Sequence, residues 1–202
     1  MKNISVQKML LAAAIAASLI FAACLTGDDG EGTDSSVIPE GKYRIRNWFN
    51  GSVNNDETFL YDNSGILGIQ AEADNDAQFW NVEIRNGKIL FKNVLSSNYI
   101  NMAGVTPSWG GDDASEGKAK VSPFSDTEDF YWELVQGSGD QSDSYNIYTA
   151  KEWNGKKAVM SIQTSIDHQT PQVFKGTVQC RNDLNDTQLA WGAQYWTFYI
   201  FD

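Results

Sequence analysis

The chain has little cysteine, histidine or proline, and the first two shortages narrow what it can be. Cys24 and Cys180 are the only cysteines among 202 residues, which excludes a framework of several disulfides. His168 is the single histidine, and no Gly-x-Ser-x-Gly nucleophile motif accompanies it. We therefore predict that the chain is not an enzyme and holds no cofactor. A glycosidase-type pair of carboxylates stays compatible with so acidic a chain, although no pair is singled out.

Basic residues are also fewer than acidic ones. The chain has 15 Lys and Arg against 26 Asp and Glu, and two of the basic residues lie in the first 23 positions, so the remainder carries 13 − 26 = −13. This balance argues against nucleic acid and anionic lipid surfaces as partners. The acidic stretch 112–116, Asp-Asp-Ala-Ser-Glu, lacks the alternate-residue oxygen spacing of a calcium loop. We expect no metal site.

Long apolar runs are missing except at the start, where Met9 to Ala23 is almost continuously apolar. A basic beginning, an apolar run of this length and small residues at its end predict a secretory signal over 1–23. The end of the run, Phe-Ala-Ala-Cys at 21–24, resembles the lipobox of bacterial lipoproteins, whose cysteine becomes the lipidated N-terminus. Phe21 departs from the leucine usual there. The alternative is an ordinary cleaved signal that leaves Cys24 as a spare thiol.

Residues 24–40 are rich in Gly, Asp and Ser and have almost nothing to bury, which predicts a disordered acidic tether. An acidic stretch directly after the lipobox resembles signals that sort some lipoproteins to the outer cell surface. We therefore expect an exported protein, lipid-anchored to the bacterial outer membrane and exposed at the cell surface. Its contact with the membrane is expected through the N-terminal lipid only.

The rest of the chain, 41–202, shows no sustained helical period. Short alternating runs rich in Tyr, Ile, Val, Phe and Trp are separated by clusters of Gly, Asn, Asp and Ser. Asn-Gly pairs at 50–51, 86–87 and 154–155 are typical of hairpin turns. The pattern predicts a single all-β domain.

Within this domain one order of features occurs three times. Each copy has three short strands, then a polar loop, then a strand with an aromatic-Trp pair: Gln-Phe-Trp ending at Trp80, Phe-Tyr-Trp at Trp132 and Gln-Tyr-Trp at Trp196. The copies span about 41–84, 85–135 and 136–202. Three four-stranded units predict a β-trefoil, a six-stranded barrel capped by three hairpins. The alternative is a jelly-roll-like β-sandwich.

These motifs resemble the ricin B-type lectin family over residues 41–202. Gly41–Asn47 resembles the opening strand of such a unit, Ser96–Met102 the second strand, and Gln78-Phe-Trp80 and Gln194-Tyr-Trp196 the Gln-x-Trp signature. The resemblance implies that Trp80, Trp132 and Trp196 lie in the core. The second unit departs from the pattern, since Phe130 stands where the other two units have Gln.

The resemblance also implies shallow sugar pockets, at most one per unit, in which a carboxylate and an amide bind hydroxyls and an aromatic ring covers the apolar sugar face. Unit two is expected to hold the best pocket and unit one the second, whereas Met160 or Ser161 occupies the Asp position of unit three. The residues expected to bind carbohydrate are Asn101, Trp109 and Asp112 in unit two, and Asp62, Asn63 and Asn75 in unit one. The loop that carries Trp109 could equally be a decorated loop without a ligand.

Two functions follow from these observations. The first is a monomeric cell-envelope lipoprotein whose trefoil binds glycans or polysaccharide without catalysis. The second is a trefoil that has lost its sugar sites and serves as a protein-interaction or envelope-structural module.

Overall fold

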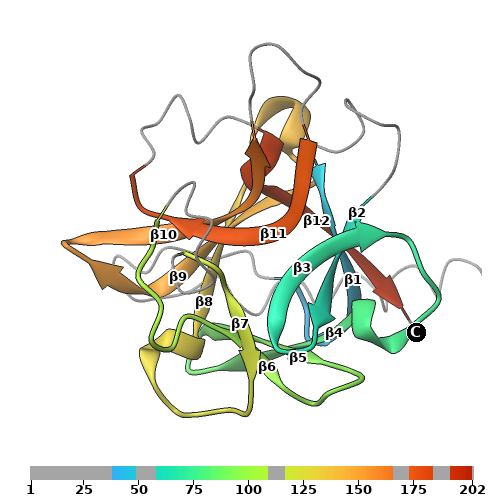
Figure 1. Cartoon of the computed structure of the whole chain (residues 1–202), viewed down its shortest axis with the longest axis horizontal. Coiled ribbons are helices and arrows are strands. Elements are labelled where there is room, and N and C mark those ends of the chain that lie inside the picture. Colours follow the sequence, from blue (N-terminus) through green and yellow to red (C-terminus); the bar gives the residue numbers. More distant parts are fainter. Residues whose placement is uncertain (1–37, 49–57, 109–116, 166–172, 184–191, 202) are drawn as a thin grey trace, which may run out of the picture. The chain divides into compact units, whose positions relative to one another are not determined.

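The computed structural model describes residues 38–48, 58–108, 117–165, 173–183 and 192–201. They belong to a compact domain, Ser35–Asp202, of strands and single turns of 3-10 helix (Figure 1). None of the described segments contains a helix long and apolar enough to span a membrane. The predictions for the signal, the lipobox at Cys24 and the tether up to residue 37 lie outside the described residues.

The described strands fall into three groups of four, each closed by a strand that begins at or just before one of the three tryptophans. Unit one comprises β1 (Gly41–Asn47), β2 (Thr58–Asn63), β3 (Ile66–Ala71) and β4 (Phe79–Arg85). Unit two comprises β5 (Lys88–Asn93), β6 (Tyr99–Asn101), β7 (Lys120–Ser122) and β8 (Trp132–Gln136). Unit three comprises β9 (Tyr145–Trp153), β10 (Lys156–Ser165), β11 (Val173–Arg181) and β12 (Tyr195–Phe201).

Strand pairing closes a six-stranded barrel from the first and last strand of each unit. Within the units, β1 pairs with β4, β5 with β8 and β9 with β12. Between the units, β4 pairs with β5, β8 with β9 and β12 with β1. Every one of these pairings is antiparallel, and the last returns the chain to its first strand. A two-sheet jelly roll does not close in this way, so the fold is a β-trefoil.

The register repeats in all three units. Trp80 lies opposite Asn93, Trp132 opposite Thr149 and Trp196 opposite Asn47. On its other side, each tryptophan lies opposite the first strand of its own unit. Residues at the same offset from the three tryptophans are therefore threefold equivalents, and they can be compared directly.

The remaining strands form three hairpins, β2–β3, β6–β7 and β10–β11, that meet at one end of the barrel. Ile66 pairs with Lys120, and Thr177 with Gly68, so that the β2–β3 hairpin touches both of the others. Two short turns are Asn-Gly as predicted: Asn86 and Asn154 have φ of 53° and are followed by glycines with φ of 71° and 73°. Positive φ at both turn residues matches the twist of the strands they join.

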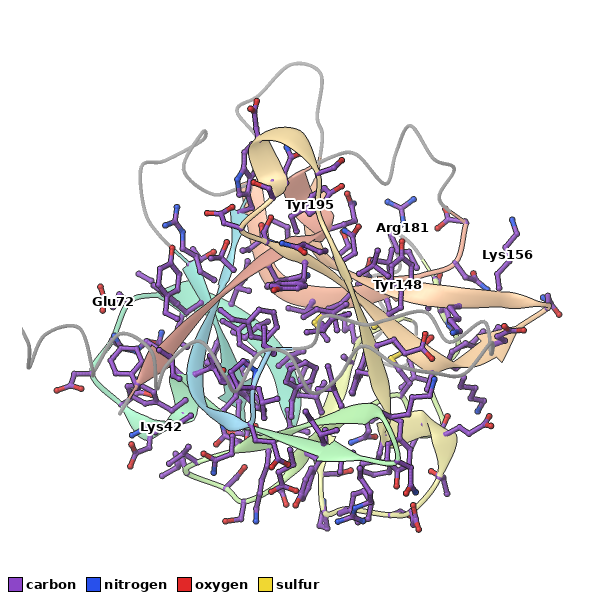
Figure 2. The ribbon with its side chains drawn as sticks, turned by 180° about the vertical axis from the view of Figure 1, so that it is seen from behind. Lys42, Glu72, Tyr148, Lys156, Arg181 and Tyr195 are labelled. Atoms are coloured by element: carbon purple, nitrogen blue, oxygen red, sulfur yellow. The ribbon has the colours of Figure 1, made fainter. Side chains whose placement is uncertain are left out.

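The core lies inside the barrel and under the hairpins, where side chains fill the space between the strands (Figure 2). Trp80, Trp132 and Trp196 are completely buried. Their indole Nε1–H groups donate to the carbonyls of Leu60, Ile100 and Met160 at 3.2, 3.1 and 3.1 Å, which ties each last barrel strand to the hairpin of its unit. Buried indole N–H groups need such partners.

Two further features of the core concern the sequence predictions. Cys180 is buried and unpaired, and burial raises the pKa of its thiol. Ile38 belongs to the core cluster, and the Tyr43 hydroxyl donates to the carbonyl of Pro39 at 2.8 Å. The folded domain therefore begins before Gly41, because residues 38–40 pack on it rather than belonging to the tether.

Candidate functional site

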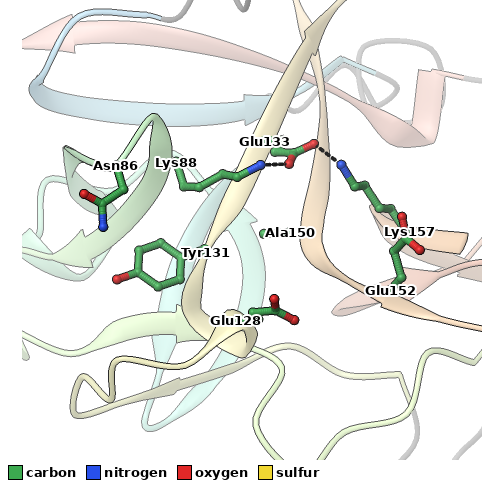
Figure 3. Close-up of a pocket in the computed structure, with 8 residues that line it drawn as sticks. All are labelled: Asn86, Lys88, Glu128, Tyr131, Glu133, Ala150, Glu152 and Lys157. Atoms are coloured by element: carbon green, nitrogen blue, oxygen red, sulfur yellow. Dashed lines mark hydrogen bonds and ion pairs between the residues drawn. The ribbon is translucent and has the colours of Figure 1, made fainter. Parts of the chain in front are cut away.

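An open pocket of about 670 Å³ lies where unit two meets unit three, on the outside of the barrel (Figure 3). Unit two contributes the start of β8, the residues just before it and the start of β5, and unit three contributes β9 and β10. The β4–β5 turn adds Asn86. The lining residues are Asn86, Lys88, Glu128, Tyr131, Glu133, Ala150, Glu152 and Lys157.

A small residue opens this pocket. Ala150 follows Thr149, and its threefold equivalents, which follow Asn47 and Asn93, are Trp48 and Val94. Two of these three positions share a backbone hydrogen bond: Ala150 N–H donates to the Tyr131 carbonyl at 2.8 Å, as Val94 N–H does to that of Phe79 at 2.9 Å. The methyl side chain of Ala150 is smaller than the side chains at both equivalent positions, and it leaves space on this side of the barrel.

Glu133 joins the strands at the back of the pocket. Its two carboxylate oxygens accept hydrogen bonds from the ammonium groups of Lys88 on β5 and Lys157 on β10 (Figure 3). Burial by itself would raise the pKa of Glu133, but the bonds from Lys157 and Lys88 outweigh it and hold the pKa below its usual value. Each lysine keeps N–H donors beyond the one directed at Glu133.

The rim of the pocket combines an aromatic ring with polar groups. Tyr131 is half-buried, and its hydroxyl donates to the carboxylate of Asp126. That hydrogen bond, together with some burial, raises the pKa of Tyr131. Glu128, in the single 3-10 turn Glu128–Phe130, and Glu152 on β9 are both exposed. The rim therefore offers a ring face, carboxylate acceptors and, at Asn86, an amide.

The structure gives Asn101 a different role from the predicted one. The side chain is completely buried, and its amide donates to the Tyr99 carbonyl at 2.9 Å and to Ser122 Oγ at 2.8 Å. Its carbonyl oxygen accepts from Ala103 N–H at 3.1 Å. These bonds within the chain fix the end of the β6–β7 hairpin. Asn101 is thus placed to hold backbone rather than to contact a sugar, because no face of it reaches the surface.

The residues predicted to bind in unit one are not brought together. Asp62 and Asn63 lie at the turn of the β2–β3 hairpin, where Asp62 Oδ1 accepts from Gly65 N–H at 2.8 Å. Asn75 lies beyond the other end of that hairpin, where Thr58 pairs with Ala71, and it caps a 3-10 turn by accepting from Ala77 N–H at 3.0 Å. Four strand residues between the two places correspond to roughly 13 Å. Asp62 and Asn75 therefore lie toward opposite ends of the hairpin.

Trp109 and Asp112, expected in the best pocket, lie outside the described residues. Phe130, which replaces the Gln of the other units, is buried in a second apolar cluster with Leu90 and Tyr99. In unit one the equivalent Gln78 instead bonds backbone, donating to the Ala71 carbonyl at 2.7 Å and accepting from Ala73 N–H at 2.9 Å. Unit two therefore has a packed aromatic ring at Phe130, where unit one has the Gln78 amide that bonds the backbone of a loop.

Sequence reasoning missed the lining of the pocket, although one signal was available. Tyr131 and Glu133 flank Trp132, and neighbouring side chains of an extended segment point to opposite faces. A core tryptophan therefore implies that both flanking residues face outward. The contribution of Ala150 could be recognised only by comparing it with Trp48 and Val94, once the units are aligned on their tryptophans.

Comparisons with known proteins agree on the fold. No protein-family model and no curated protein sequence matches the chain. Among solved structures, the Macrolepiota procera ricin B-like lectin in complex with lactose is similar with a TM-score of 0.56 at 14% identity, over 82% of this chain and 99% of that one. The designed threefold-symmetric protein ThreeFoil has a TM-score of 0.57 at 13% identity, over 80% and 100%.

A GlcNAcα1-4Gal-releasing endo-β-galactosidase from Clostridium perfringens is similar too, with a TM-score of 0.53 at 18% identity. The match covers 80% of this chain but only 32% of the enzyme, so the chain spans about a third of that protein's length. At these identities the likeness concerns the fold. The chain has the β-trefoil architecture that ricin B-like lectins share.

Proposed function

We propose that this protein is a non-catalytic carbohydrate-binding module that holds a glycan in the pocket between units two and three. The observation that carries the proposal is the make-up of that pocket: an open hollow with the Tyr131 ring beside carboxylate, amide and ammonium groups. Sugars need a flat apolar surface for their C–H face together with directional partners for their hydroxyls. A half-buried ring with a few convergent polar groups supplies both.

The fold supports the same function. Structures similar to this chain include a ricin B-like lectin in complex with lactose and a protein bound to the asialo-GM1 saccharide. A shallow pocket on the outside of a rigid barrel suits a ligand that is held at a few hydroxyls, with water bridging the rest. Catalysis has less support, since no Gly-x-Ser-x-Gly motif accompanies the single histidine of the sequence and Cys180 is buried.

The proposal places this module at the cell envelope. The apolar run Met9–Ala23 and the cysteine after it suggest export and lipid attachment at Cys24, with the domain held outside the membrane by a short acidic segment. In this arrangement the domain would retain polysaccharide near the cell that makes the protein. A domain on a short tether raises the local concentration of weak sites at that surface.

Filling the pocket tests the function. Ala150→Trp introduces the residue that the chain itself carries at the equivalent Trp48, and its large ring is expected to occupy the hollow. Glycan-array binding is expected for the unchanged protein and is expected to fall at least about tenfold in the variant, the equivalent of roughly 1.4 kcal/mol. Ala150→Ser, which keeps the space open, serves as the control. Binding that survives Ala150→Trp, or no binding to a broad panel, would contradict the proposal.

One observation favours the alternative of a protein-interaction module. The positions that correspond to sugar contacts by resemblance are used inside the domain, as Asn101 is, or are spread over a hairpin, as Asp62 and Asn75 are. A folded protein that binds no glycan but crosslinks to a protein on intact cells would support this alternative.

A further inference from the structure

The pocket is not electrically neutral. Its lining carries Glu128, Glu133 and Glu152 against Lys88 and Lys157, a formal charge of 2 − 3 = −1. The ion pairs are also unevenly distributed, because both lysines direct an ammonium group at Glu133. The positive charge in the pocket is therefore concentrated around one carboxylate at its back.

The two other carboxylates have no such partner. Glu128 and Glu152 are exposed at the rim, and neither forms an ion pair or a side-chain hydrogen bond with a residue in the described ranges. Glu152 lies opposite Lys157 in the β9–β10 register, but that lysine's ammonium group is bonded to Glu133. In Figure 3 Glu128 and Glu152 reach the hollow from different elements, and Ala150 and Tyr131 line the same hollow.

We infer, building on the proposed function, that this pocket selects sugars that carry a free, protonated amino group over their N-acetylated forms. An ammonium group has three donors and a full positive charge, which match two carboxylates that no side chain in the described ranges engages. The face of a tyrosine ring adds a favourable site for a cation. An acidic sugar meets the opposite situation at the rim, because its carboxylate would face Glu128 and Glu152, whereas both lysines direct an ammonium group at Glu133 at the back.

Long-range electrostatics acts in the same direction. The chain after residue 23 carries a formal charge of −13, so a cationic glycan is attracted toward the domain before it reaches the pocket. The net charge of the chain and the carboxylates of the pocket could each favour an amino sugar. The two contributions can be separated, because only the contribution of the pocket depends on which carboxylates are removed.

The experiment uses the full chain on an array of matched pairs: glucosamine, galactosamine and mannosamine oligosaccharides, each with free amines and N-acetylated. We expect the free-amine member of at least one pair to bind about tenfold more tightly, as two charges near an ammonium group at a surface can provide. Glu128→Gln with Glu152→Gln keeps the shape of the pocket and removes both charges, and it is expected to abolish most of this preference. Asp140→Asn with Asp143→Asn removes two charges at exposed positions outside the pocket lining and is the matched control.

The possible outcomes distinguish a failure of the amine preference from a failure of carbohydrate binding itself. Equal binding of both members of every pair, stronger binding of the N-acetylated members, or an equal effect of the control double variant would overturn the amine preference while carbohydrate binding stands. Binding that is confined to uronic acid oligosaccharides would overturn it as well. No binding to any sugar overturns both.

Discussion

The three core tryptophans occupy equivalent positions, so the same substitution is expected to destabilise the domain by a similar amount at each of them. Trp80, Trp132 and Trp196 are each completely buried and each donate one hydrogen bond to a carbonyl at 3.1–3.2 Å. Substituting any of them by Phe leaves that carbonyl without its partner, which costs about 1–3 kcal/mol. The smaller ring also leaves a void of a few tens of Å³, which adds about 1 kcal/mol at ~24 cal/mol per Å³.

We therefore expect Trp→Phe at each of the three positions to lower the free energy of unfolding by about 2–4 kcal/mol, with the three values close to one another. Trp48 is the matched control, because its side chain is 38% exposed. The same substitution there is expected to change stability by about 0.5 kcal/mol or less. Urea unfolding followed by far-ultraviolet circular dichroism measures all four. A buried position that costs less than about 1 kcal/mol, or a control that costs as much as the others, would refute the reasoning.

Two further predictions concern the back of the pocket and the N-terminus. Glu133→Gln is expected to destabilise the domain by about 1 kcal/mol at neutral pH, since the pair partners are partly exposed. The folded pKa of Glu133 lies below its unfolded value. The destabilisation by Glu133→Gln is therefore fully present above pH ~4.3 and is lost as the pH falls through the folded pKa. Urea midpoints of the two proteins that differ by the same amount from pH 3 to 7 would contradict this. For the anchor, Cys24→Ala is expected to abolish incorporation of labelled palmitate and to move the protein from the membrane fraction to the soluble fraction. An unchanged protein that is already soluble and unlabelled would argue for an ordinary cleaved signal, and membrane association that persists in the variant would contradict the lipid anchor.

The strands could be predicted from the sequence because their causes are local. Alternation of period two, broken by Asn-Gly at 86–87 and 154–155, sets strand limits without reference to distant residues. The repeated tryptophans then predict the barrel, since three similar units that each bury one large ring must pack around a common axis. The sequence predicts that the domain starts at Gly41 and misses Ile38, because the burial of Ile38 depends on strands far along the chain.

The site could not be predicted in the same way. Asn101 belongs to a strand, Tyr99–Asn101, in which all three residues are buried, so alternation does not indicate which face it occupies. Whether an alanine opens a pocket depends on what surrounds it, and the surroundings of Ala150 come from β5, β8, β9 and β10 together. A polar residue near a family motif marks a position along the strand, whereas binding requires exposure and convergence in space.

The measurement that tests the central claim most directly is a titration of the isotope-labelled protein with its best array glycan, followed by backbone amide shifts. If the glycan binds between units two and three, the largest shifts are expected at Tyr131, Glu133, Ala150 and Glu152, and Ala150→Trp should remove them. Largest shifts at the β2–β3 turn around Asp62, or shifts that persist unchanged in Ala150→Trp, would contradict the account.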